Sequence, residues 1–327
     1  MLLASARDSV RMAGMKSAFI VLVWVGLAGT AAGQSGSGGF DEQAWAAGIT
    51  AQRKARNDEF RSRDWSALAV VAIAPLGRQR LVLGSGGDAD LRLESPDVAA
   101  AHAELIRTSG KDGKPTVRVR ALDGSVWSTG EKPAEVRDLA LQPDARVRIG
   151  RFLVYWNNFS TFGPVVRVLD FESEAFTRFD GLSYFAPDPA YRVVADVRPF
   201  AHAERVLIGD TQGWRRPAWR YGEASFTLKG RSLKVVLFLL KAEPAPDDTF
   251  FIAFSDRTSG RETYPAARYL TPAFVRSGPL VLDFNLASNP LCAYNAGFAC
   301  PLPPRENRIP IEIRAGEKLY PHAAGHH

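Results

Sequence analysis

The feature of this sequence that most constrains its fold is a long succession of short apolar or alternating runs separated by Gly, Pro and Asp. Examples are RLVLG at 80–84, TVRVRAL at 116–122, ARVRIGRFLVYW at 145–156 and SLKVVLFLL at 232–240. Alternation with a period of two places successive side chains on opposite faces of a strand, and the turn residues end each strand. So many short strands predict a mainly all-β protein built from sandwiches or barrel-like sheets.

The first 33 residues have the order of segments that is typical of a secretory signal peptide. Basic residues precede an apolar run at 18–28, and small residues follow it in AGTAAGQSGSGG. The apolar run is shorter than the roughly 20 residues that a helix needs to cross a bilayer, and an uncleaved anchor is the alternative. We therefore expect a secreted or periplasmic protein, with cleavage near Ala32 or Gly33 and no membrane span after cleavage.

Helix is expected mainly at the front of the chain. Between Phe40 and Arg61, the apolar residues Trp45, Ile49 and Phe60 punctuate a charged segment, which predicts an amphipathic helix packed on another part of the protein. The strand rhythm breaks at NNFSTFGP, and this break is our candidate domain boundary. The expected organisation is a signal peptide at 1–33, a linker at 34–39, the helix at 40–66, β domains at 67–157 and 158–318, and a disordered tail at 319–327.

The charge of the chain is mildly positive and is not concentrated. Lys and Arg together number 41 against 35 Asp and Glu, a net charge of +6. The densest basic clusters, RQR and WRRPAWR, are short and are expected to lie in solvated loops. Proteins that bind nucleic acid usually carry a long basic patch that follows the phosphates, so we expect no nucleic-acid partner.

The segment LVLGSGGDADLRLESPDVAAAHAELI at 81–106 resembles the forkhead-associated fold. The residues at matching places are Gly84, Asp90, Leu91, Leu93, His102 and Ala103. Further on, LDGSVWSTGEK and LQPDARVRIGRFLVYW look like the Asn-Gly-Thr turn and the last two strands of that family. The resemblance covers roughly residues 68–157 and implies a β-sandwich.

The departures from the forkhead-associated pattern concern the phosphate site. In that family an arginine and a serine bind phosphothreonine through charge-assisted hydrogen bonds. Here Ser85 and Ala99 stand at those positions, and Ala100 replaces a second arginine of the recognition loop. We therefore expect a degenerate scaffold that binds no phosphothreonine peptide, in which His102 braces a loop through internal hydrogen bonds.

Three stretches in the second half carry a second resemblance. They are FDGLSYFAPDPAYRV at 179–193, the stretch 251–270 with its run TSGRETY, and the stretch 280–318 with DFN, NPLC and CPLPPRENR. Together they closely resemble an uncharacterised bacterial and archaeal family, the domain of unknown function number 1684. The resemblance spans most of residues 45–318, with Ile309 where leucine is usual, and it implies no known reaction.

Polar residues concentrate in these C-terminal strands. A strand-turn-strand unit contains Asp256, Thr258, Glu262, Tyr264 and Arg268. If the second signature lies alongside, six further residues converge on that unit: Asp283, Asn285, Tyr294, Glu306, Asn307 and Arg308. Such a set suits a small polar or anionic ligand. The alternative is an internal ion-pair lattice in which Arg268 and Arg308 tie loops to carboxylates such as Glu262 and Asp283.

Cys292 and Cys300 are the only cysteines, and they stand eight residues apart. A metal site would need two further ligands, and a thioredoxin-like pair would need two intervening residues at a helix start. Because export permits oxidation, we expect a structural disulfide between the two cysteines. Buried free thiols are the first alternative, and a metal or redox role is the second.

Several catalytic patterns are missing from the sequence. It has no Gly-x-Ser-x-Gly elbow, no phosphate-cradling loop and no His-Glu-x-x-His helix, so no metal or cofactor is expected. His202 is the one histidine left as a candidate general base, and a surface role is the alternative. We expect a non-catalytic binding or structural module of the cell envelope. The competing hypothesis is a hydrolase that uses Glu262, Glu306 or Tyr264.

Overall fold

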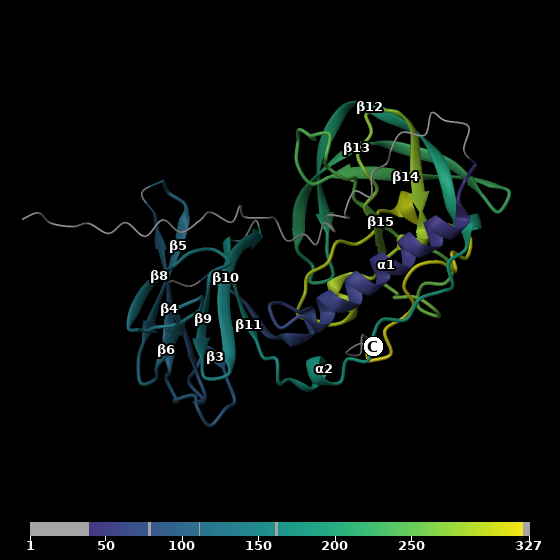
Figure 1. The fold of residues 1–327 in the computed structure, drawn as a ribbon. Coiled ribbons are helices and arrows are strands. Elements are labelled where there is room, and N and C mark those ends of the chain that lie inside the picture. The colour runs from purple at the N-terminus through teal and green to yellow at the C-terminus, as the bar shows by residue number, and fades with distance from the viewer. Residues whose placement is uncertain (1–38, 78–79, 111, 161–162, 323–327) are drawn as a thin grey trace, which may run out of the picture.

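The computed structural model describes residues 39–77, 80–110, 112–160 and 163–322. The expected signal peptide, residues 34–38 of the expected linker and residues 323–327 of the expected tail lie outside this range. The fold is mainly β, with two β bodies and one long helix (Figure 1). Within the described residues, no helix is long and apolar enough to cross a membrane.

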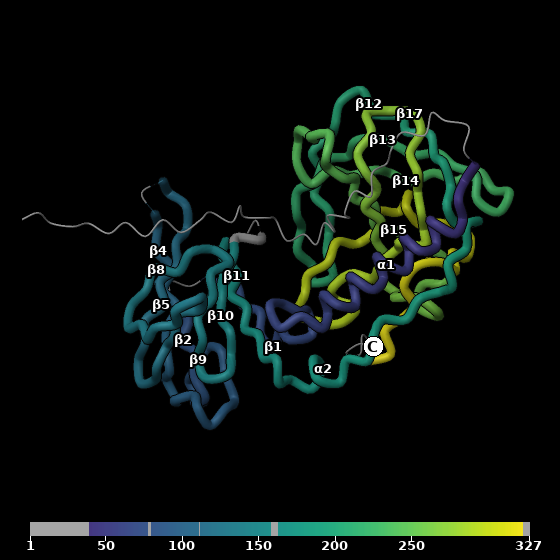
Figure 2. Tube along the Cα trace, viewed as in Figure 1, coloured from purple at the N-terminus to yellow at the C-terminus, as the bar shows by residue number. Residues whose placement is uncertain are grey.

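The helix α1 (Glu42–Arg61) begins at Asp41, whose carboxylate accepts a hydrogen bond from the Ala44 N–H at 2.9 Å. Such a cap satisfies one of the free N–H groups of the first turn. The buried face of α1 contains Ile49, Arg56 and Phe60. Although α1 precedes the first β body in sequence, it lies across the second one (Figure 2), where it contacts the C-terminal segment.

The first β body is a sandwich of two sheets. The six-stranded sheet has the order β1 (Val70–Pro75), β11 (Gly163–Leu169), β10 (Phe152–Ser160), β9 (Arg146–Ile149), β6 (Val126–Ser128), β7 (Glu135–Val136). The five-stranded sheet has the order β3 (Leu91–Arg92), β2 (Arg80–Gly84), β4 (Ala103–Ser109), β5 (Pro115–Ala121), β8 (Asp138–Leu141). Apolar side chains of both sheets, such as Leu105 and Val154, form one buried core between them.

The structure moves the expected domain boundary at residue 157. Asn157 lies inside β10 and pairs with Val165 of β11, and β11 also pairs with β1. The sandwich therefore extends to Leu169. The described residues of NNFSTFGP belong to β10 and β11, which are paired strands of one sheet, and two such strands have the same sequence signals as a domain boundary.

The second β body contains a four-stranded antiparallel sheet and long irregular segments. The sheet has the order β14 (Arg231–Leu239), β13 (Arg215–Leu228), β12 (Arg192–Gly209), β17 (Gly278–Asp283), and β15 (Ile252–Phe254) pairs separately with β16 (Arg268–Leu270). The remaining helices are single turns: α2 (Glu174–Thr177), η1 (Ala67–Ala69), η2 (Pro189–Tyr191), η3 (Phe284–Leu286), η4 (Leu291–Ala293) and η5 (Arg305–Asn307). A core of buried apolar residues from the sheet, from β15 and from the C-terminal segment fills this body.

A third core joins the two bodies. It combines Phe60 of α1, Leu169 of the sandwich and Phe298 of the segment that holds the cysteines. In the same region Asn295 donates through Nδ2 to the carbonyl oxygen of Val70 at 2.6 Å. Tyr320 is also buried in this core, so the expected disordered tail is wrong at its start, because the described chain stays packed at that residue.

Candidate functional site

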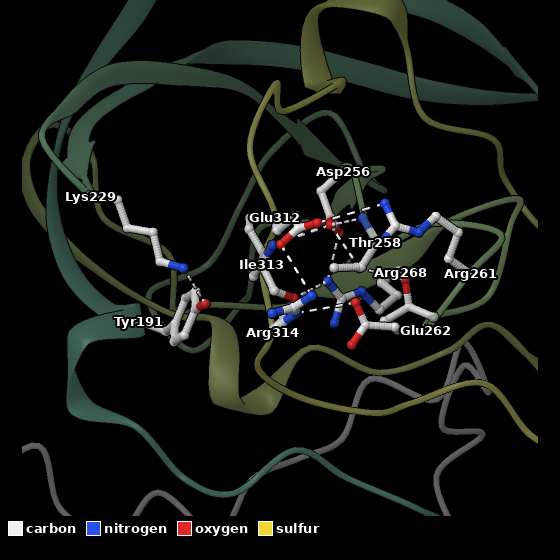
Figure 3. Close-up of polar contacts among 11 residues, drawn as sticks. Tyr191, Lys229, Asp256, Thr258, Arg261, Glu262, Arg268, Glu312, Ile313 and Arg314 are labelled. Atoms are coloured by element: carbon white, nitrogen blue, oxygen red, sulfur yellow. Dashed lines mark hydrogen bonds and ion pairs between the residues drawn. The ribbon is translucent and has the colours of Figure 1, made fainter.

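The centre of the predicted C-terminal site is a buried ion pair. Arg268 and Asp256 are 2.6 Å apart between Nη2 and Oδ2, and the two side chains are 1% and 0% exposed (Figure 3). Arg268 also donates through Nη2 to the carbonyl oxygen of Ile313 at 2.9 Å. Burial lowers the pKa of the Arg268 guanidinium, and the charge of Asp256 opposes this shift. The pair fastens β16 to the C-terminal segment, which is a structural role.

The second carboxylate oxygen of Asp256 is also fully engaged. Oδ1 accepts from the backbone N–H and from the hydroxyl of Thr258, both at 2.7 Å, and from the N–H of Ile313 at 3.2 Å. Thr258 is itself buried, and its hydroxyl lies 2.9 Å from that of Thr263. Asp256 and Thr258 therefore shape the turn after β15.

Glu262 belongs to a separate network on the surface. Its carboxylate accepts from Arg314 Nε at 3.1 Å, and Arg314 also pairs with Glu312, which pairs in turn with Arg261 (Figure 3). The hydrogen bond and charge of Glu262 raise the pKa of Arg314. The ion-pair lattice expected from the sequence pairs Glu262 with Arg268 or Arg308. That expectation is wrong, because Arg268 is occupied by Asp256 and Arg314 lies closer on the surface.

Tyr294 contacts a buried carboxylate that the sequence analysis missed. Its hydroxyl donates to Glu317 Oε2 at 2.7 Å, while Arg56 of α1 donates through Nε to Oε1 at 2.6 Å. The hydroxyl of Tyr184 and the N–H of Asn289 complete the set. Burial and the charge of Glu317 raise the pKa of Tyr294 well above its ordinary value. This network joins α1 to the C-terminal segment.

The residues Asp283 and Asn285 form another separate cluster. Asn285 accepts from the N–H of Asp188 and donates to its carbonyl oxygen, both at 2.9 Å. Asp283 accepts from the Asn285 side chain at 2.9 Å and from Trp45 Nε1 at 2.6 Å. These contacts hold the end of β17 against η2 and α1, so both residues have structural partners.

Asn307 fastens the η5 turn to two strands. Its side-chain oxygen accepts from the N–H of Val236 at 2.7 Å, and its side-chain nitrogen donates to the carbonyl oxygens of Val236 and Ala253. Asn307 is completely buried. Because both ends of its amide are used on backbone, Asn307 fixes the position of its neighbour Arg308.

The two cysteines are buried free thiols, so the expected disulfide is corrected. Cys300 Sγ accepts from the N–H of Cys292 at 3.2 Å, and the hydroxyl of Tyr264 donates to the carbonyl oxygen of Cys292 at 3.3 Å. A hydrogen bond with Cys292 and burial raise the pKa of the Cys300 thiol well above its ordinary value. Packing and hydrogen bonds hold the segment in place without a covalent link.

Arg308 is placed differently from the other predicted residues. It borders a hollow of about 390 Å³ whose lining residues are Ser255, Asp256, Ser259, Pro265, Ala266, Leu302, Pro303 and Arg308. Arg308 is exposed, and its guanidinium makes no hydrogen bond or ion pair within the part of the chain that the structure describes. Its neighbour Glu306 pairs with Arg220 at 3.1 Å instead.

Two hydroxyl groups accompany Arg308 at this hollow. Ser255 and Arg308 form a parallel bridge, with the N–H of Ile309 donating to the Ser255 carbonyl oxygen at 2.8 Å, so the side chains of Ser255 and Arg308 lie on the same side. Ser259 accepts from the N–H of Asp256 through Oγ at 3.1 Å, which leaves its hydroxyl proton to donate. The hollow therefore offers one guanidinium and two hydroxyl donors.

The expected convergence of eleven residues on one ligand is therefore not what the structure shows. Of the predicted set, Asp256 and Arg308 line the hollow, and Thr258 and Asn307 support its walls. The others lie in the separate contacts described above: Glu262, Tyr264, Arg268, Asp283, Asn285, Tyr294 and Glu306. Arg56 was detectable, because it shares a helical face with Ile49 and Phe60. No spacing in the sequence pointed to Glu317 or Arg314.

Hydrogen bonds of His102 and Ser85 connect the loops of the sandwich to one another. His102 is buried, accepts from the N–H of Ala99 through Nδ1 at 3.1 Å, and bonds through Nε2 to the Ser125 carbonyl oxygen at 2.9 Å. The hydroxyl of Ser85 donates to the carbonyl oxygen of Val98 at 2.7 Å. Its hydroxyl proton is thus used inside the protein. His202 is exposed on β12.

Comparison with known proteins identifies the second body. Residues 177–318 match the family model described as "Protein of unknown function (DUF1684)". The chain belongs to the DUF1684 family. It is similar to the uncharacterized protein from gene locus rrnAC0354 of Haloarcula marismortui, known from a solution NMR structure. The two are 35% identical, the match covers 43% of this chain and 78% of that chain, and the TM-score is 0.38. No curated protein matches this DUF1684 chain.

Two further solved structures are similar to part of this DUF1684 protein. The Slr1951 protein of Synechocystis sp. is 21% identical, with 28% of this chain and 80% of that chain covered and a TM-score of 0.20. An FHA domain studied for phosphothreonine-dependent interactions is 18% identical, with 28% and 77% covered and a TM-score of 0.19.

Proposed function

We propose that this DUF1684 protein is an exported, non-catalytic module of the cell envelope that binds a small anion in the hollow at Arg308. One observation carries the proposal. The guanidinium of Arg308 borders the hollow and has no partner among the described residues, whereas Arg220, Arg268 and Arg314 are each paired with a carboxylate. A planar guanidinium presents a fork of donors that suits carboxylate or phosphate oxygens. Beside it, the hydroxyls of Ser255 and Ser259 add neutral donors.

The competing hydrolase hypothesis requires a carboxylate or a phenol that is free to move a proton. Asp256 is the one carboxylate among the lining residues, and its two oxygens accept bonds from Arg268, Thr258 and Ile313. Tyr264 is buried against Cys292. Glu262 and Glu306 pair with different arginines. These contacts favour binding over hydrolysis.

The location in the envelope rests on the sequence of the first 33 residues, with its basic, apolar and small segments in that order. In this proposal the sandwich is a scaffold beside the DUF1684 body, and it binds no phosphothreonine peptide. The engaged hydroxyl of Ser85 and the alanines at 99 and 100 support that part of the proposal. The C-terminal body carries the ligand site.

The proposal is tested by thermal unfolding of the chain without its first 33 residues in the presence of phosphate, sulfate or acetate. An anion at ten times its Kd stabilises the folded state by about 1.4 kcal/mol, which raises the Tm by a few degrees. We expect Arg308→Gln to lose this shift. Arg305→Gln is the matched control, because Arg305 is also exposed, also belongs to the η5 region and does not line the hollow.

Phosphate and sulfate stabilise many proteins by exclusion from the surface, so the readout is the difference between the variants rather than the shift itself. Both variants remove one positive charge, so a general charge effect would change them equally. An equal loss in Arg308→Gln and Arg305→Gln contradicts the proposal. The absence of any anion-dependent shift in the unaltered protein also contradicts it.

A further inference from the structure

We infer that the hollow at Arg308 accepts a carboxylate carried on a short apolar chain, in preference to phosphate. The inference rests on the proposed function, since it specifies the ligand class of the same site. It depends on three features of the hollow, namely its charge, its apolar wall and the rigidity of its frame.

The charge of the hollow matches a single negative charge. Arg308 is the only cation among the lining residues, the charge of the lining carboxylate Asp256 is paired with Arg268, and Ser255 and Ser259 are neutral donors. Phosphate monoanions and dianions carry more oxygens and up to two charges, and protein sites for them usually gather several cations or backbone N–H groups. A carboxylate has two oxygens, which one guanidinium fork can bind side by side.

The remaining wall of the hollow is apolar. Pro265 and Ala266 follow the Thr258 turn, and Leu302 and Pro303 precede η5. Leu302 is 38% exposed, so part of its side chain faces solvent. An inorganic anion would leave this wall in water, whereas an aliphatic chain attached to the carboxylate would cover it. Each methylene buried in this way is expected to tighten binding about fourfold.

The frame around the hollow is fixed before any ligand binds. On one side Asn307 ties the backbone next to Arg308 to Val236 and Ala253. On the other side the buried Asp256–Arg268 pair holds the turn that carries Ser259. A preformed site loses little conformational entropy on binding. At about 390 Å³ the hollow is near the lower end of the usual range of ligand sites, which leaves room for a short chain attached to the carboxylate.

The test is a chemical-shift titration of the isotope-labelled protein, lacking residues 1–33, with acetate, propionate, butyrate and inorganic phosphate at constant ionic strength. We expect affinity to rise about fourfold with each added methylene from acetate to butyrate, and phosphate to bind more weakly than propionate. We expect Arg308→Lys to weaken the carboxylates about tenfold, because an ammonium group keeps the charge and loses the fork.

The apolar wall is tested separately with Leu302→Ser, which should flatten the dependence on chain length. Leu319→Ser is its control, since Leu319 is equally exposed and does not line the hollow. If phosphate binds through Arg308 and the carboxylates show no dependence on chain length, the inference is wrong and the proposed function stands. If neither phosphate nor any carboxylate responds to Arg308→Gln, both are wrong.

Discussion

The sandwich and the C-terminal body of this DUF1684 protein differ in what lies between their backbone layers. In the sandwich, two regular sheets enclose a core of mainly aliphatic side chains, together with Phe152 and Trp156. In the C-terminal body, the described residues after β17, at 284–322, form no strand, and buried polar side chains such as Arg268, Asn307 and Glu317 hold this segment in place. Irregular backbone carries N–H and C=O groups that no sheet satisfies, so side chains supply the partners.

This difference teaches how a family signature can be read. The runs TSGRETY and PPRENR contain many groups that resemble a ligand set, and most of them bind other parts of the same chain. Asn307 binds two strands, and Thr258 binds Asp256. Arg308, in the same run as Asn307, has no such partner. The signature therefore specifies mainly the fold of the irregular segment, and the guanidinium of Arg308, which borders the hollow, points to a ligand.

The largest expected effect concerns the thiols at the junction of the two bodies. In the folded protein Cys292 and Cys300 are buried, and the raised pKa of Cys300 keeps that thiol neutral at pH 8. We expect both to react with a thiol reagent at pH 8 at least ~1000-fold more slowly in the folded protein than in urea. The measurement is the absorbance of the released thiolate over time.

The same experiment, run without reductant, distinguishes thiols from a disulfide. Two thiols per chain should appear after unfolding, and none would mean that the cysteines are linked. Because the folded pKa of Cys300 is raised above its unfolded value, the contribution of this thiol to stability is present below about pH 8.5 and is lost as the pH rises through the folded pKa. A rise of stability with pH in that range would contradict the shift.

The next largest effect is expected when the buried Asp256–Arg268 ion pair of the C-terminal body is broken. Asp256→Ala leaves Arg268 buried without its counter-charge, and removing one partner of a buried pair typically costs about 3–5 kcal/mol. The free energy of unfolding from urea titration measures it. Replacing both partners, as in Asp256→Ala with Arg268→Met, should cost less than Asp256→Ala alone. A single variant as stable as the unaltered protein would show that the pair does not hold the segment.

A comparable substitution in the sandwich tests the other half of the comparison. Leu105 of β4 is completely buried between the sheets, and Leu105→Ala should destabilise the protein by about 3 kcal/mol through a lost apolar contact and a cavity. Leu105→Met keeps most of the volume and should cost less than about 1.5 kcal/mol. An equal loss in both variants would indicate that shape, rather than apolar volume, determines the stability of the sandwich.

The strands could be predicted from the sequence because their cause is local. Alternating runs such as those of β5 and β9 show their period directly, and the brace at His102 sits where the forkhead-associated resemblance placed it. The predicted domain boundary at residue 157 was wrong because it rested only on local turn residues. A turn sequence between two strands does not reveal whether those strands share a sheet.

Partner choice among the charged residues could not be predicted, because it depends on contacts far apart in sequence. Arg56 and Glu317 are separated by 261 residues, and Arg268 reaches Ile313 across 45. From the sequence alone, several carboxylates near Arg268 were possible partners. The fold of the chain determines that the partner is Asp256. That the Arg308 guanidinium has no partner among the described residues could not be predicted either, because its neighbour Glu306 pairs with Arg220 instead.

The smallest expected effect separates buried charge pairs from exposed ones. Arg314→Ala removes the centre of the surface network with Glu262 and Glu312, in which the Arg314 side chain is 50% exposed. Exposed ion pairs contribute little to stability and weaken with salt, so the free energy of unfolding should fall by far less than in Asp256→Ala. Urea titrations at low and high salt measure the loss, which should shrink as salt rises. A loss of stability as large as that of Asp256→Ala, and unchanged by salt, would mean that the surface network holds the C-terminal segment as firmly as the buried Asp256–Arg268 pair does. The expected difference between buried and exposed ion pairs would then be wrong.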